Sequence, residues 1–145
     1  MDKVSSVGQQ RFLDLCRHHH LKITPQRIAI YQRLMEAEHH PSAEDVYEAV
    51  LPDYPNISFD TVYRTLSTFA EIGLTSIVEG FGKARRFDAN LDLHHHFHCE
   101  KCGAILDFTY PDFDKLSMPR ELEEKFEVRR KRVVLTGLCE KCSKK

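Results

Sequence analysis

The chain has 145 residues, 41% of them hydrophobic, and a formal net charge of −1 at pH 7. No run approaches the roughly 18 apolar residues of a membrane-spanning helix, and the N-terminus MDKVSSVGQQ lacks a signal-peptide core. The sequence therefore argues against a membrane or secreted protein and predicts a cytoplasmic one. Residues 1–87 carry 10 Lys and Arg against 11 Asp and Glu, which argues against nucleic-acid binding through bulk charge.

Two helices are predicted at the start of the chain. Apolar residues at helical spacing indicate a first helix over 9–17, with Cys16 on the apolar stripe that faces the core. Thr24 followed by Pro25 is typical of a helix start. The second helix is expected to end near His39, because the proline that follows His40 disfavours helix continuation.

Two further helices are predicted before residue 74. Ser42 with Asp45 three residues later predicts a capping box at the start of a third helix, which ends near Leu51. Ser58 is expected to cap a fourth helix and Gly73 to end it. The inner stripe of this helix would consist of Val62, Leu66, Phe69 and Ile72. The opposite face carries groups that could meet phosphates and base edges, namely Asp60, Thr61, Tyr63, Arg64 and Thr68.

A β-hairpin is predicted after the fourth helix, with strands over 74–78 and 84–87. Helices followed by such a hairpin are typical of a winged helix, in which the fourth helix enters the major groove and the hairpin contacts the flanking backbone. Residues 1–87 are therefore interpreted as a winged-helix DNA-binding domain. An ordinary amphipathic surface helix remains the alternative for the fourth helix.

The rest of the chain is predicted to form a hinge over 88–93 and a small α/β domain over 94–145, so the chain as a whole is of the α+β class. The expected elements are strands over 95–99 and 104–108, a helical stretch over 112–126 interrupted near Pro119, and a last strand over 128–138. So small a sheet would have exposed edges, which a second copy of the chain could cover.

Four cysteines of the second domain form two Cys-x-x-Cys pairs, Cys99/Cys102 and Cys139/Cys142. Two such pairs together offer the four soft ligands that Zn²⁺ takes in a closed, tetrahedral structural site. Two disulfides or a redox motif are the alternative, which the predicted cytoplasmic location and the presence of two pairs disfavour. We expect loss of the metal to unfold this domain.

Histidines cluster just before the first cysteine pair. Side chains alternate along a strand, so His94 and His96 point to one side and His95 to the other. His98 shares the side of His94 and His96 and could compete for metal, although an exposed strand histidine is the favoured interpretation. The run from His18 to His20 is expected to be solvated or partly packed.

Together these residues resemble the ferric uptake regulator family of metal-dependent transcriptional repressors over nearly the whole chain. The matching stretches are ITPQR (23–27), HPSAEDVY (40–47), DTVYRTL (60–66), RRFD (85–88), HHHFHCEKCG (94–103) and GLCEKC (137–142). The resemblance implies a homodimer with an N-terminal winged helix, a C-terminal dimerisation domain, a Cys₄ structural zinc and a regulatory metal at the domain junction.

By motif position, the resemblance implies five ligands for the regulatory metal, namely His40, Asp88, His94, His96 and Asp107. Three imidazoles and two carboxylates suit Fe²⁺ or Mn²⁺ and would leave one octahedral position open to an oxidant. Aspartate at positions 88 and 107 resembles the peroxide-sensing branch, in which peroxide reacts with bound Fe²⁺, a histidine ligand (His40 or His94) is oxidised, and DNA is released. The alternative is an iron-sensing repressor of iron-uptake genes, because peroxide sensors often carry Asn where this chain has Arg64.

Phosphate contacts are expected from Arg27, Arg64, Lys83, Arg85 and Arg86, and base contacts from Tyr63 with Ser58 and Thr61 nearby. Asp60 would repel phosphate and alter operator preference. A further metal site of some relatives is expected to be absent, because its positions read Arg129, Arg130 and Lys131.

The predicted partners are a double-stranded DNA operator and a second copy of the chain, with no membrane and no small organic substrate. An ion held by both domains would select the arrangement in which the recognition helices of a dimer fit successive half-sites. Two other classes stay open. A non-haem iron enzyme is disfavoured, because no acid, base or nucleophile set is left over for catalysis. A zinc-only interaction module would fold without reading DNA.

Overall fold

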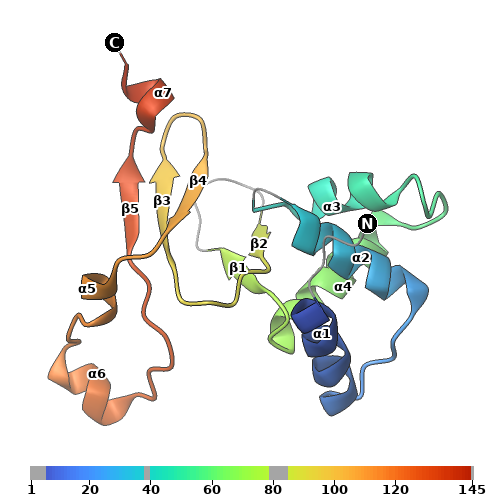
Figure 1. The fold of residues 1–145 in the computed structure, drawn as a ribbon, viewed down its shortest axis with the longest axis horizontal. Helices are drawn as coiled ribbons and strands as arrows, with labels where there is room; N and C mark the ends of the chain where they lie inside the picture. The colour runs from blue at the N-terminus through green and yellow to red at the C-terminus, as the bar shows by residue number, and fades with distance from the viewer. Residues whose placement is uncertain (1–5, 38–39, 79–84, 145) are drawn as a thin grey trace. The chain divides into compact units, whose positions relative to one another are not determined.

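The structure is a computed structural model that describes residues 6–37, 40–78 and 85–144 (Figure 1). Contacts within the chain divide it into two compact units, Met1–Leu91 and Asp92–Lys145. Both helices and strands are present, so the predicted α+β class is confirmed. Among the described residues, no helix combines the length and the apolar character needed to cross a membrane.

The described part of the first unit contains helices followed by a two-stranded sheet. Its elements are α1 (Ser6–His18), α2 (Pro25–Glu36), α3 (Ala43–Val50), α4 (Phe59–Glu71), β1 (Ser76–Val78) and β2 (Arg86–Asp88). The strands pair antiparallel, with Ile77 opposite Phe87. Residues 79–84, which include the predicted tip of the hairpin and Lys83, lie outside the described residues.

Local capping explains where these helices begin. The side chain of Thr24 accepts a hydrogen bond from the Arg27 N–H at the start of α2. Ser42 and Asp45 form the predicted capping box at α3, and Ser58 caps α4. These predicted helix starts are confirmed, because each depends on residues within one turn of one another.

The boundary between α4 and β1 differs from the prediction for a local reason. Gly73 has a φ of +88°, a conformation that favours glycine, and the Leu74 N–H donates to the Phe69 carbonyl at 2.8 Å. Leu74 therefore completes the end of α4, and the strand begins only at Ser76. Asp88, which the sequence placed in the hinge, is the last residue of β2.

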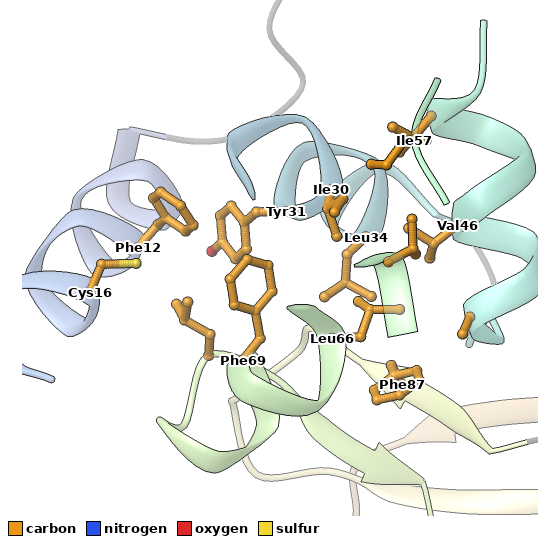
Figure 2. Close-up of a cluster of buried hydrophobic side chains, with 14 residues drawn as sticks. Phe12, Cys16, Ile30, Tyr31, Leu34, Val46, Ile57, Leu66, Phe69 and Phe87 are labelled. Atoms are coloured by element: carbon orange, nitrogen blue, oxygen red, sulfur yellow. The ribbon is translucent and has the colours of Figure 1, made fainter. Parts of the chain in front are cut away.

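The core of the first unit is formed by apolar side chains from all four helices and β2, which point toward one another in Figure 2. Phe69 of α4 packs edge-on against Phe12, with 5.8 Å between ring centroids. Cys16 is fully buried here, as predicted. Ile72, the last residue of the predicted inner stripe, is only partly buried.

The second unit is a three-stranded sheet with short helices. Its elements are β3 (His95–Cys99), β4 (Ile105–Phe108), α5 (Pro111–Asp114), α6 (Arg120–Lys125), β5 (Val134–Gly137) and α7 (Glu140–Ser143). Strand β3 lies in the centre, antiparallel to β4 and parallel to β5 (Figure 1). The helical stretch expected over 112–126 is two short helices, the second of which starts after Pro119, and the last strand is shorter than expected.

Burial in the second unit is unusual for a small sheet. Its buried side chains among the described residues are His94, His95, His96, His98 and Cys99, whereas the large apolar side chains of this unit stay at least partly exposed. The expectation of an exposed His98 is wrong, because this side chain is only 4% exposed. His98 lies on the central strand, where neighbouring strands on both sides reduce its access to water.

Candidate metal centres and DNA-reading helix

The four cysteines of the Cys-x-x-Cys pairs lie together at one end of the second unit. Their sulfur atoms are all within 4.8 Å of one another, and the Sγ atoms of Cys102 and Cys139 are 3.7 Å apart. Zn–S bonds of about 2.3 Å in a tetrahedron separate the sulfurs by about 3.8 Å, whereas a disulfide needs about 2.05 Å. The arrangement fits a zinc ion, and all four cysteines are free of disulfides.

Hydrogen bonds shift the pKa values of these thiols in different directions. The backbone N–H groups of Cys102 and Cys139 lower the pKa of Cys99 to about 6. A hydrogen bond with the Cys139 side chain raises the pKa of Cys142 to about 12. A zinc ion binds thiolates, so binding would release the proton that Cys142 holds.

The second unit also contains a set of two imidazoles and a carboxylate. The Nε2 atoms of His94 and His96 lie 3.8 and 3.3 Å from Asp107 Oδ1. The Nδ1 atom of His94 is 2.6 Å from the Asp92 carbonyl, which fits a ring that donates from Nδ1 and keeps the Nε2 lone pair for a ligand. The pair His94 and His96 is buried, and Asp107 is 37% exposed on its side chain.

The first unit contains a second pair of candidate ligands. His40 Nε2 lies 3.4 Å from Asp88 Oδ2, and both side chains are buried. The Asn90 N–H donates to Asp88 Oδ1 at 2.9 Å, which orients the carboxylate. The segment that carries His40 lies beside β2, because the Phe87 N–H donates to the Pro41 carbonyl at 2.9 Å.

The remaining histidines are placed differently. His95 points to the other side of β3, as the alternation predicts, and its Nε2 atom is 2.8 Å from Asp114 Oδ1. His18, His19 and His20 are exposed, as expected. They do not appear in a group of three metal-ligating side chains among the described residues.

Helix α4 presents a polar face with its own internal contacts. Arg64 forms an ion pair with Asp60 at 3.0 Å, with both side chains well exposed. The hydroxyls of Ser58 and Thr61 are 2.9 Å apart, and Ser58 also caps the helix. Tyr63 is partly buried against the core, so only part of its ring is available for a base contact.

The predicted phosphate contacts outside α4 vary in exposure. Arg27 is partly buried, and its guanidinium donates to the Lys22 carbonyl at 2.5 Å. Arg85 is exposed, and Arg86 is half-buried within β2. Lys83 lies outside the described residues.

Sequence reasoning missed one residue that the structure brings to a histidine. Asp114 lies 19 positions from His95 in the chain, in a stretch expected only to be a polar helix. No known sequence motif has this spacing, so the contact between Asp114 and His95 could be found only from the fold.

The chain is similar to known proteins in family, in sequence and in fold. The model of the ferric uptake regulator family matches residues 18–136. The peroxide-responsive repressor PerR of Staphylococcus aureus (strain Mu50 / ATCC 700699) is 38% identical over 125 residues, which are 86% of this chain and 84% of that protein.

Solved structures of similar fold come from several bacteria. The ferric uptake regulator of Pseudomonas aeruginosa with manganese is 31% identical, with a TM-score of 0.70 over 86% of this chain and 95% of that one. PerR from Streptococcus pyogenes is 30% identical, with a TM-score of 0.52 over 92% and 91% of the two chains. The Helicobacter pylori regulator, 22% identical with a TM-score of 0.78 over 100% and 99% of the chains, shows the fold alone.

Proposed function

The chain belongs to the ferric uptake regulator family of metal-dependent transcriptional repressors, which are regulators and not enzymes, and from this premise we propose that it senses peroxide. The observation that carries the proposal is the ligand chemistry. Both carboxylates of the proposed ligand set are aspartates, Asp88 in the first unit and Asp107 in the second. The similarity to a peroxide-responsive repressor points the same way.

We further propose that one divalent ion takes ligands from both units. The first unit supplies His40 and Asp88, and the second supplies His94, His96 and Asp107. This donor set suits Fe²⁺ or Mn²⁺, and a related regulator has been solved with manganese. A preference of about 3 kcal/mol for one arrangement of the units would change its population by roughly two orders of magnitude, which is enough for a switch.

The second unit is proposed to form the homodimer. Phe97 pairs with Leu106 on one neighbouring strand and with Leu135 on the other, so an apolar row crosses the sheet. Leu106 and Leu135 are 54% and 44% exposed, which leaves this row open to water in a single subunit. A second copy of the chain would cover it, and the pair of subunits would present two copies of α4 to successive half-sites of a DNA operator.

Peroxide sensing would follow from the chemistry of bound Fe²⁺ and of its histidine ligands. Bound Fe²⁺ would supply the reducing power that activates peroxide next to the imidazoles. Overall, one histidine and one H₂O₂ give one 2-oxohistidine and one water. Conversion of His40 or His94 weakens the ligand set, so the units lose the arrangement that fits DNA.

A decisive experiment compares the two metals in zinc-loaded protein. Protein carrying Fe²⁺ or Mn²⁺ is treated with equimolar H₂O₂, and peptides are examined by mass spectrometry for a gain of one oxygen atom. We expect the gain on His40 or His94 in the Fe²⁺ form only, together with loss of operator affinity. His95 and the exposed His18 serve as internal controls, because neither lies in the proposed ligand set.

The second candidate function is iron-dependent repression of iron-uptake genes. Arg64 at the exposed face of α4 favours it, because the peroxide-sensing branch often carries Asn there. If operator binding depends on Fe²⁺ but neither metal form gains oxygen, the iron-sensing function replaces the peroxide-sensing one.

A further inference from the structure

His95, the middle residue of the histidine triplet, has both ring nitrogens engaged by the protein. Its Nδ1 atom accepts a hydrogen bond from the Val133 N–H at 2.9 Å. Its Nε2 atom lies 2.8 Å from Asp114 Oδ1. A nitrogen that accepts carries no proton, so the ring is neutral and donates from Nε2. With both nitrogens used in this way, His95 has no lone pair left for a metal ion.

The segment from Lys131 to Val133 contacts both His95 and the end of α5. Lys131 Nζ donates to the Asp114 and Leu116 carbonyls at 2.8 and 2.6 Å. The Lys131 ammonium group thus ties the segment before β5 to the C-terminal end of α5.

The same segment also contacts the backbone of the two neighbouring histidines. Arg132 Nε donates to the His94 carbonyl at 3.3 Å, and the His96 N–H donates to the Val133 carbonyl at 3.2 Å. Two consecutive residues, Arg132 and Val133, therefore contact the backbone or side chain of all three histidines. A shift of this segment would move His94 and His96 together.

Aromatic rings limit the freedom of His95 from the side. Its ring centroid lies 5.7 Å from Phe108 and 5.6 Å from Phe113, and these two rings are 6.1 Å apart. His95 itself is 1% exposed. Packed rings leave the imidazole one orientation, so its hydrogen bonds to Asp114 and Val133 are fixed in direction.

We propose that His95, Asp114 and Lys131 form a metal-free clasp that positions His94 and His96 for the regulatory ion. The inference rests on the proposed function, because it assigns the clasp a role toward that ion. Side chains of a strand alternate, so holding His95 on one side sets the direction of its neighbours on the other. His95 and Asp114 are positioning residues, and groups that orient ligands from outside the coordination sphere commonly change metal affinity by 10- to 100-fold.

The test measures Mn²⁺ binding to the zinc-loaded, full-length dimer. Asp114→Ala removes the acceptor and is expected to weaken Mn²⁺ binding about 10-fold and to alter the electron paramagnetic resonance line shape of bound Mn²⁺. Asp114→Asn keeps an oxygen that accepts from Nε2 and is expected to stay within about twofold of the parent protein. Asp112→Ala, an exposed aspartate of the same helix, is the matched control and should bind normally.

A second variant keeps the test usable if Asp114→Ala does not fold. Lys131→Met removes the donors to both carbonyls but keeps most of the length of the side chain, and it is expected to weaken Mn²⁺ binding by a smaller factor. Zinc content and the dimer should stay unchanged in both variants, since the cysteine site lies elsewhere in the unit.

Two results would overturn the clasp alone. One is normal Mn²⁺ affinity and line shape in both Asp114→Ala and Lys131→Met. The other is an additional metal equivalent in the parent protein that Asp114→Asn removes, because His95 and Asp114 would then be ligands. If the parent protein binds no Mn²⁺ beyond its zinc, the proposed function falls and the clasp with it.

Discussion

Two ionisable residues in the core of the first unit are held neutral. Burial raises the pKa of the Cys16 thiol, with a smaller opposing effect from Arg27. Burial also raises the pKa of Tyr31, whose hydroxyl donates to the Gly8 carbonyl at 3.0 Å. Both groups ionise more easily in the unfolded chain than in the folded one.

This difference predicts a loss of stability in alkaline solution. A raised pKa contributes its full stability below the unfolded value, about 8.5 for a thiol and 10 for a tyrosine, and the stability declines as pH rises above those values. We expect the urea concentration at the unfolding midpoint to be lower at pH 10 than at pH 7.5. The double variant Cys16→Ala/Tyr31→Phe should be less stable than the parent protein at pH 7.5. Its stability should nevertheless drop less than that of the parent between pH 7.5 and pH 10, and an equal drop in the two proteins would contradict the assignment.

Substitution of one proposed metal ligand should abolish metal control of DNA binding without affecting folding. His94→Ala removes one imidazole beside Asp107 but leaves the four cysteines in place. We expect it to abolish metal-dependent operator binding while zinc content and the dimer remain, as measured by fluorescence anisotropy and sedimentation. His19→Ala, in the exposed histidine run, is the control. Metal-dependent binding that survives in His94→Ala would mean that the regulatory site lies elsewhere.

At the scale of the element, α4 combines a buried stripe with a polar face that is nearly neutral. Val62, Leu66 and Phe69 are fully buried, and the opposite face is the one proposed to contact DNA. The ion pair between Asp60 and Arg64 would oppose the proposed phosphate contact, because Arg64 would have to leave its partner to reach a phosphate. An exposed pair of this kind contributes at most about 1 kcal/mol, so DNA can displace it.

Removal of Asp60 is therefore expected to strengthen DNA binding. Asp60→Ala should bind both operator and random duplex about three- to fivefold more tightly and make the dependence of log K on log salt steeper by about one unit, since Arg64 becomes a further phosphate contact. Glu71→Ala, at the far end of α4, is a matched loss of one negative charge. Equal effects of the two variants would show that net charge, and not the pair with Arg64, is responsible.

At the scale of the whole molecule, the two units are stabilised by different means. The first has an apolar core supplied by its helices and β2 (Figure 2). The second buries mainly histidines and Cys99 among its described residues, which supply little apolar area for folding. We therefore expect its stability to depend on a zinc ion held by the four cysteines and on the proposed dimer contact.

Zinc removal should accordingly affect one unit only. A strong chelator, or Cys139→Ser, is expected to collapse the amide resonances of residues 92–145 into the range of unfolded chains, while those of the first unit stay dispersed in a two-dimensional NMR spectrum. Cys16→Ser, which lies outside the sulfur cluster, should retain zinc. Dispersed resonances for both units after complete zinc removal would contradict this division.

The sequence by itself determined the features that depend on neighbours in the chain. The helix starts at Thr24, Ser42 and Ser58 follow from hydrogen bonds within one turn, and the buried stripe of α4 follows from the helical period. The limits of β3 were also predicted, because the strand lies between the predicted hinge and the first Cys-x-x-Cys turn. These signals are local, so no knowledge of the fold was needed.

Only the tertiary structure decided how distant segments meet. The parallel pairing of β3 with β5 brings Val133 to His95, and a turn of the chain brings Asp114 to the same ring. The burial of His98 also follows from its place on a central strand. Such contacts depend on which strands become neighbours, and that choice is made by the packing of the whole unit, which no short stretch of sequence encodes.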